Sequence, residues 1–342
     1  MSIMDFLGRL LGVRPAPAAA SANKATAGKA SGRARSTRDA RYESEILSVD
    51  SLRFVGQSAR SENKRWVVGW TDRLPSMNPR RGCSDGSIVL IDYPADRVVA
   101  RITDLYRPME GDVADNGTFL FNDANFGDRL SGDVHAYDVS GKRLFNRTFA
   151  ANVLNLAISK CGRYGVVQTA NARGDDGNLL ELYDLRAGTT LFSREPETGW
   201  SDRYAFSVND TGELTRLTVV HNDLGRFGYA PTGEFLEKGA YRKARLDNGS
   251  AESRVYGAKD ALKADPANRA VAEEVLATLD AALGELHEQR SDFLALGLRV
   301  KGEALEVLDR KAQAMVAYEQ ALAIDPKIGV AKRLATLRKG AS

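Results

Sequence analysis

The pentapeptide GCSDG at positions 82–86 matches the G-x-S-x-G pattern of a serine nucleophile. In that pattern the serine sits on a sharp turn between a strand and a helix, with a histidine close by. Here the run GSIVLIDY at 86–93 follows directly, and its aliphatic and β-branched residues predict a strand. We therefore interpret the pentapeptide as a plain turn. The alternative reading is an enzyme, a hydrolase with Ser84 as its nucleophile or a lyase, with a pocket on one face of the β-rich domain.

Metal, cofactor and catalytic sites are not predicted. The chain has only three histidines and two cysteines, and their spacing fits no zinc motif; they are His135, His221, His287, Cys83 and Cys161. The segment DANFGD at 123–128 is similar to a calcium loop, but it lacks the oxygen ligand at its fifth position and the glutamate at the twelfth. We expect no cofactor, no metal and no enzymatic activity.

Acidic residues recur in three polar loops that separate short apolar runs. They are Asp123, Asp128, Asp175, Asp176 and Asp223. If these loops lie on one face of the protein, their carboxylates could receive a basic protein partner or a cation. The alternative interpretation is that they are ordinary solvated turns.

The elements around these loops repeat along the chain. Short runs rich in Val, Ile, Leu, Phe and Tyr alternate with Gly, Asn and Asp turns from residue 43 to 240, which predicts strands. Four positions that end the third run of each unit lie 46 residues apart each time: Asp92, Asp138, Asp184 and Ala230. Each unit therefore reads as four short antiparallel strands.

These units resemble WD40-like and PQQ-like β-propeller repeats over residues 45–240. The aromatic-Asp pairs Tyr137-Asp138 and Tyr183-Asp184 carry the resemblance best. The resemblance implies a propeller-like domain of four units, at the small end of the range for propellers. The sequence allows a closed ring of four units, an open arc, or an arc that another copy of the chain completes. The stretch ESEILSVDS at 43–51 could add a closing strand to the last unit.

The hydrophobic period changes from strand-like to helical after residue 252. Residues 252–339 resemble tetratricopeptide repeats, most specifically over 295–328. The residues that carry the resemblance are Leu298, Gly302, Leu305, Ala314, Tyr318, Ala321 and Pro326. The resemblance implies helical hairpins in which small residues allow close approach and Pro326 ends the second helix. It also implies that Arg299, Glu303 and Glu306 face a peptide-binding groove. The Lys/Asn set with which some members of the family clamp a C-terminal carboxylate is absent there, so the alternative is that these helices serve packing and not peptide capture.

The first 42 residues differ in composition from the rest. Residues 1–13 have apolar side chains at helical spacing, including Ile3, Phe6, Leu7, Leu10 and Leu11, which predicts a short amphipathic helix. Residues 14–42 are rich in Ala, Ser, Gly and basic residues, which predicts a disordered basic linker. We expect the helix to dock on a hydrophobic groove of a partner or on an anionic membrane. The alternative is that it packs on the propeller-like domain of its own chain.

The sequence as a whole predicts a multidomain protein, all-β and then all-α. A net charge of +3 gives no global bias toward nucleic acid. No apolar run approaches the roughly 20 residues that cross a bilayer, and the start lacks the features of a secretory signal. We therefore expect a cytoplasmic scaffold or adaptor that binds protein partners, with peripheral membrane contact and oligomerisation left open.

Overall fold

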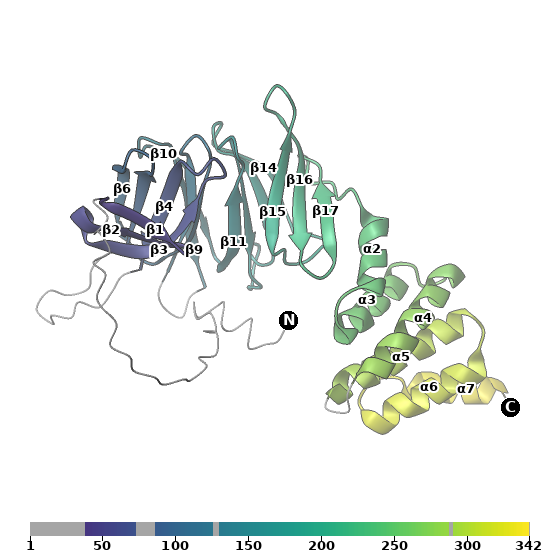
Figure 1. Cartoon of the computed structure of the whole chain (residues 1–342). Helices are drawn as coiled ribbons and strands as arrows, with labels where there is room; N and C mark the ends of the chain where they lie inside the picture. Colours follow the sequence, from purple (N-terminus) through teal and green to yellow (C-terminus); the bar gives the residue numbers. More distant parts are fainter. Residues whose placement is uncertain (1–37, 73–85, 126–129, 287–289, 342) are drawn as a thin grey trace, which may run out of the picture. The chain divides into compact units, whose positions relative to one another are not determined.

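The structure, a computed structural model, describes residues 38–72, 86–125, 130–286 and 290–341 (Figure 1). The chain divides into two compact units, Met1–Pro196 and Glu197–Ser342. Among the described residues it forms four antiparallel, β-propeller-like sheets followed by six helices. The change of hydrophobic period after the strands is thus a real change of architecture.

The first unit contains three sheets whose strands follow one another in sequence order. The first sheet has six strands: β1 (Ala40–Glu43), β2 (Ile46–Val49), β3 (Phe54–Arg60), β4 (Trp66–Thr71), β5 (Gly86–Asp92) and β6 (Arg97–Leu105). The second has four: β7 (Pro108–Val113), β8 (Phe119–Ala124), β9 (Gly132–Tyr137) and β10 (Arg143–Phe149). The third has β11 (Val153–Ile158), β12 (Tyr164–Thr169), β13 (Leu180–Asp184) and β14 (Thr189–Arg194).

The second unit begins with a three-stranded sheet of β15 (Arg203–Val208), β16 (Leu214–His221) and β17 (Gly225–Tyr229). Helices follow: α2 (Lys238–Asp247), α3 (Ala251–Ala264), α4 (Arg269–Glu285), α5 (Ser291–Val307), α6 (Lys311–Ile324) and α7 (Ala331–Ala341). Asn268 caps α4 by accepting hydrogen bonds from the amides of Ala270 and Val271. Asp325 follows α6 just before Pro326, so this helix ends where the proline predicts.

The repeated positions 46 residues apart occupy the same place in their sheets. Asp92 and Asp184 end β5 and β13, and each forms a 2.9 Å ion pair with the arginine that precedes the neighbouring strand, Arg65 or Arg163. Asp138 follows β9 and accepts hydrogen bonds from the turn amides of residues 140 and 142. These contacts show that the three aspartates support a turn or join two neighbouring strands.

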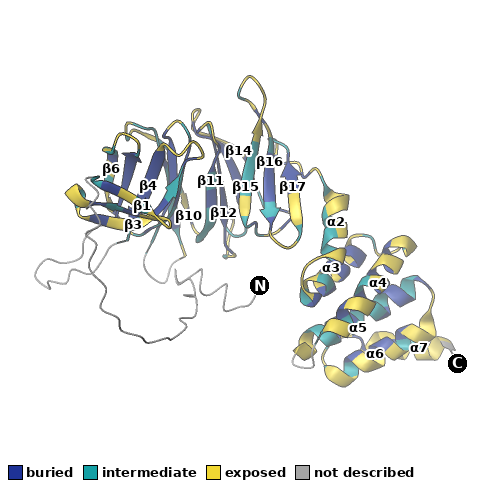
Figure 2. Ribbon diagram, viewed as in Figure 1, coloured by how far each residue is buried: buried dark blue, intermediate teal, exposed yellow. Residues whose placement is uncertain are grey.

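Apolar side chains of neighbouring sheets in the first unit pack against one another. Figure 2 shows buried strands within these sheets. Val68, Ile88 and Leu90 of the first sheet pack against Phe119 and Phe121 of the second. The opposite face of the second sheet packs on the third through a further apolar cluster that includes Leu120, Val134, Leu156, Val167 and Tyr183. Face-to-face packing of successive four-stranded sheets is the arrangement of a propeller.

Three sequence-based expectations need correction. The stretch at 43–51 does not complete the last sheet, because β2 pairs with β3 inside the first sheet. The predicted linker ends too late, since β1 already begins at Ala40, which is 2% exposed. The fourth of the 46-residue repeats has three strands. Its expected fourth strand is reduced to an isolated bridge between Tyr229 and Phe235. The segment after this bridge enters α2 instead.

Candidate interaction surfaces

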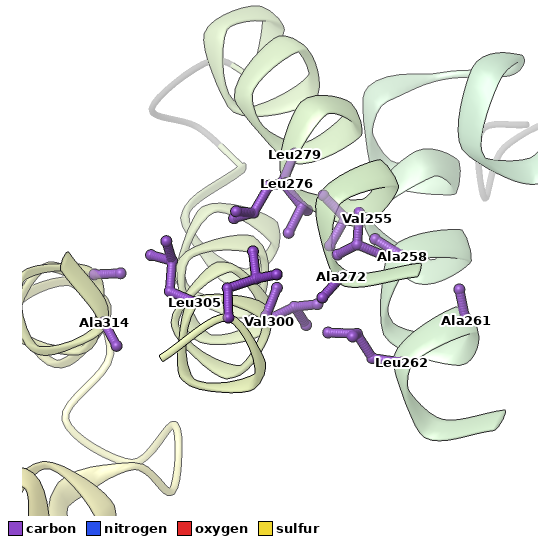
Figure 3. Packing of buried hydrophobic residues seen from close by; sticks show 14 of the residues in the cluster. Val255, Ala258, Ala261, Leu262, Ala272, Leu276, Leu279, Val300, Leu305 and Ala314 are labelled. Carbon is purple, nitrogen blue, oxygen red and sulfur yellow. The ribbon is translucent and has the colours of Figure 1, made fainter. Parts of the chain in front are cut away.

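The helices share one apolar core, to which α3, α4, α5 and α6 contribute (Figure 3). Within it α5 and α6 approach closely because Gly302 lies against the ring of Tyr318, where a Cβ atom would overlap the ring. Ala314, Tyr318 and Ala321 are fully buried on the facing side of α6. The small and large positions singled out in the sequence therefore meet at this helix pair.

Arg299 and Glu303, predicted to face a groove, take part in a polar network within the helices. Their side chains pair at 3.0 Å along α5, and the Arg299 guanidinium also donates to the carbonyl of Ile328 at 3.2 Å. Arg333 of α7 approaches Glu303 at 3.8 Å and pairs with Glu306 at 2.6 Å. These contacts tie α5 to the last helix, so the three predicted groove residues, Arg299, Glu303 and Glu306, are partly engaged in contacts within the helices.

An aromatic pair on α3 and α5 is more accessible to a protein partner than Arg299 and Glu303. Tyr256 is 44% exposed, and its ring meets the edge of Phe293 with centroids 5.6 Å apart. Lys259 lies 5.8 Å from the Tyr256 ring, and the guanidinium of Arg290 lies 4.4 Å from the Phe293 ring. Sequence reasoning missed this pair, because its residues lie 37 positions apart and only the packing of α3 beside α5 joins them.

The acidic loop residues divide into buried and exposed groups. Asp123 is 4% exposed and accepts hydrogen bonds from the amides of Tyr106 and Arg107 at 3.0 and 2.5 Å. Burial raises the pKa of the Asp123 carboxyl. Asp176 pairs with Arg147 at 2.6 Å and accepts from the amide of Ala150 at 2.7 Å.

Asp175 and Asp223 are exposed, whereas Asp128 lies outside the described residues. Asp175 and Asp176 belong to the connection between β12 and β13, and Asp223 to that between β16 and β17. Asp123 and Asp176 accept hydrogen bonds from backbone amides of their own unit. Of the described acidic residues, only Asp175 and Asp223 are therefore left to form an acidic surface.

The described part of the GCSDG motif is Gly86, the first residue of β5. A strand thus follows where a nucleophile elbow requires a helix. Ser84 itself lies outside the described residues.

Both described histidines lie among aromatic rings, His221 buried and His135 half-buried. His135 lies 5.3 Å from the Phe121 ring, and His221 lies 6.1 Å from Phe227 and 6.3 Å from Tyr241. Burial lowers the pKa of each imidazole, so both are neutral at neutral pH.

The predicted docking residues Ile3, Phe6, Leu7, Leu10 and Leu11 lie outside the described residues. Among the residues that the structure describes, no helix is long and apolar enough to cross a membrane. The same residues contain no group of three or more acidic, histidine or cysteine side chains arranged to hold a metal ion.

No protein-family model and no curated protein matches the sequence. Among solved structures, the chain is similar to the β-propeller domain of the Trilobed protease from Pyrococcus furiosus, with TM-score 0.35, 11% identity, and coverage of 53% of this chain and 55% of that one. Cps50 (Swd1) of Myceliophteria thermophila gives TM-score 0.33 and 10% identity for its β-propeller domain, covering 54% of this chain and 57% of that one. Kuenenia stuttgartiensis hydrazine synthase gives TM-score 0.33 and 13% identity, covering 53% and 47%. The chain thus spans about half the length of these structures.

Proposed function

We propose that this protein is a non-catalytic scaffold in which the helices hold a protein partner. The observation that carries the proposal is the aromatic pair of exposed Tyr256 and half-buried Phe293, with a cation beside each ring. An exposed tyrosine beside a second aromatic ring and an arginine supplies the large contact area that concentrates binding energy at protein interfaces. We further propose that the hairpin of α5 and α6 is of tetratricopeptide type, since its small and large residues meet at Gly302 and Tyr318.

The N-terminal segment would determine where the scaffold is held. Its apolar residues, including Phe6 and Leu10, lie at helical spacing and are followed by a basic linker. A partner groove would bind the apolar face alone, whereas an anionic membrane would also attract the linker.

The test of partner binding is quantitative capture from native extract by the full chain and by Tyr256→Ala/Phe293→Ala. We expect the double variant to lose a captured protein at least tenfold, as for an interface centre. Val316→Ala is the matched control, because Val316 is 52% exposed on α6 and lies apart from the pair. Equal capture by wild type and the double variant would contradict the proposed surface. An activity of the purified protein that Ser84→Ala abolishes would contradict the non-catalytic proposal.

Docking is tested separately by removing residues 1–13. We expect the truncated chain to lose co-sedimentation with vesicles of anionic lipid if a membrane is the target, or to lose one captured protein if a groove is the target. The Phe6→Asp/Leu10→Asp variant should behave like the truncation, whereas Ser2→Asp should not. Unchanged binding in both assays would remove the docking role.

A further inference from the structure

The fold leaves two positive charges of α3 without an ionic partner. Lys259 and Lys263 are exposed, and neither forms an ion pair within the part of the chain that the structure describes. The other charged side chains of this helix are all paired with side chains outside it: Glu252 with Arg290 at 2.8 Å, Arg254 with Glu285, and Asp260 with Arg245 at 2.7 Å. The two lysines are therefore the charges of α3 that remain for an external ligand of opposite sign.

These lysines lie on the same side of the helix as the exposed aromatic residue. Tyr256, Lys259 and Lys263 follow one another at intervals of three and four residues, which places them on one face of α3. The Lys259 ammonium lies 5.8 Å from the centre of the Tyr256 ring. The Tyr256 hydroxyl has no hydrogen-bond partner among the described residues. We call these three residues the α3 stripe.

The position of the lysines along the helix does not by itself account for them. Lys263 lies in the last turn of α3, where a cation interacts favourably with the unpaired carbonyl groups of the helix end. Lys259 lies one turn earlier, where this effect has faded. The α3 stripe thus combines one aromatic ring, one free hydroxyl donor and two free ammonium donors on a single face.

We propose, building on the proposed function, that the α3 stripe binds an extended acidic segment of the protein partner. Lys259 and Lys263 are separated by a rise of about 6 Å along the helix. Alternate side chains of an extended chain point the same way and lie about 6.6 Å apart. Carboxylates on alternate residues of the segment can therefore each face one lysine, while an apolar side chain of the segment packs on Tyr256.

The charge next to Phe293 gives the bound segment a direction. Asp292 is exposed in the first turn of α5 and precedes Phe293, whose ring meets that of Tyr256. A carboxylate of the partner would be repelled at this end of the α3 stripe. The apolar residue of the segment therefore lies toward Phe293, and its carboxylates lie toward Lys263.

Binding of fluorescein-labelled peptides to the full chain, followed by fluorescence anisotropy, tests the proposal. The acidic probe carries one phenylalanine followed by two glutamates on alternate residues, with serines between them. The matched neutral probe carries glutamine in place of each glutamate. We expect the acidic probe to bind at least threefold more tightly and to weaken as salt is added, because exposed charge pairs are screened. Equal affinities for the two probes, or no binding of the acidic probe, would overturn the proposal.

The variant Lys259→Gln/Lys263→Gln tests the lysines directly. We expect it to weaken binding of the acidic probe about threefold to tenfold and to leave the neutral probe unchanged. Lys332→Gln/Lys339→Gln is the matched control, because it removes the same charge from two exposed lysines of α7. Both variants should keep the circular dichroism spectrum of wild type. Equal weakening in the two variants would indicate a general effect of net charge and contradict a site on α3.

Single-stranded nucleic acid is the other anionic polymer that aromatic and basic side chains bind. A labelled thymidine decamer serves as its probe, and we expect it to bind more weakly than the acidic peptide. If the decamer instead binds more tightly, and Lys259→Gln/Lys263→Gln weakens it, the α3 stripe is a nucleic-acid site and the proposal fails.

The capture experiment separates this inference from the proposed function. We expect Lys259→Gln/Lys263→Gln to reduce the amount of the same protein that Tyr256→Ala/Phe293→Ala loses. If the aromatic variant loses the protein and the lysine variant keeps it in full, the proposed surface stands and the acidic segment is ruled out. If the aromatic variant keeps it as well, the surface itself is contradicted.

Discussion

At the scale of the residue, small side chains decide how closely elements approach. Gly302 in α5 has no space for a methyl group, because the ring of Tyr318 in α6 occupies it. A glycine inside a helix costs about 1 kcal/mol relative to alanine, so its presence in the helix interior indicates a packing requirement. Here the packing of Tyr318, which is fully buried, outweighs that cost.

We expect Gly302→Ala to lower the free energy of unfolding of the helices by about 1–3 kcal/mol, because the added methyl group forces the Tyr318 ring away. Urea denaturation followed by circular dichroism at 222 nm measures the effect. Gly284→Ala is the matched control, since nothing lies within 4 Å of a Cβ atom at Gly284 in α4. That control should be neutral or stabilising, and equal losses in both variants would contradict the packing role of Gly302.

Burial of His221 should make the stability of the second unit depend on pH. The pKa of the folded imidazole is below 6.5, so the unfolded chain binds the proton more readily than the folded one. The stabilisation is therefore complete above about pH 6.5 and falls as the pH drops below that value, by at most about 1.4 kcal/mol per pH unit. His221→Phe should reduce this slope between about pH 7 and 5 in urea titrations. An identical slope in the variant would contradict the assignment.

At the scale of the element, a recurring aspartate fixes the end of the third strand in the propeller-like sheets. Asp184 is 6% exposed, pairs with Arg163 and also accepts hydrogen bonds from the amides of Arg186 and Ala187 at 3.1 and 3.0 Å. The 46-residue period of the sequence marks this position in the first three sheets, whereas Ala230 stands there in the fourth.

We expect Asp184→Ala to cost about 1–3 kcal/mol of stability in the first unit, because it leaves turn amides and a guanidinium without their acceptor. Asp175→Ala is the control, since Asp175 is an exposed carboxylate of the same sheet. It should stay within about 0.5 kcal/mol of wild type. Equal melting temperatures for the two variants would show that Asp184 does not support the turn.

At the scale of the whole molecule, the two compact units have separate cores. The cluster that includes Val255, Val275 and Leu305 belongs to the helices, and the clusters around Leu90 and Leu120 belong to the first unit. Chains built from several such units often unfold in more than one transition.

We expect Leu305→Ala to cost about 2–5 kcal/mol and to lower the melting temperature of the helices alone. Leu90→Ala should instead lower the transition of the sheets. Differential scanning calorimetry together with circular dichroism at 222 nm distinguishes the two. A single transition that both variants shift equally would contradict independent unfolding.

The local periodicity of the sequence predicted part of the fold. The recurrence of Asp92, Asp138 and Asp184 every 46 residues predicted the repeated sheets. The resemblance to tetratricopeptide repeats implied the contact between the helices that carry Gly302 and Tyr318. Such patterns are readable because each residue's neighbours in its own strand or helix fix the face on which it lies.

Contacts between residues far apart in the sequence became visible only in the folded chain. Strand pairing places residues 46–49 in the first sheet and not in the last. There Leu47 and Val49 bury the apolar residues Val67, Val89 and Ile91 of the first sheet. Asp123 and Asp176 satisfy backbone amides that lie 16 or more residues away, which no local pattern reveals. For the same reason Tyr256 and Phe293 became neighbours only when α3 packed beside α5. Burial and pairing depend on register between distant segments, and one sequence read alone does not contain that register.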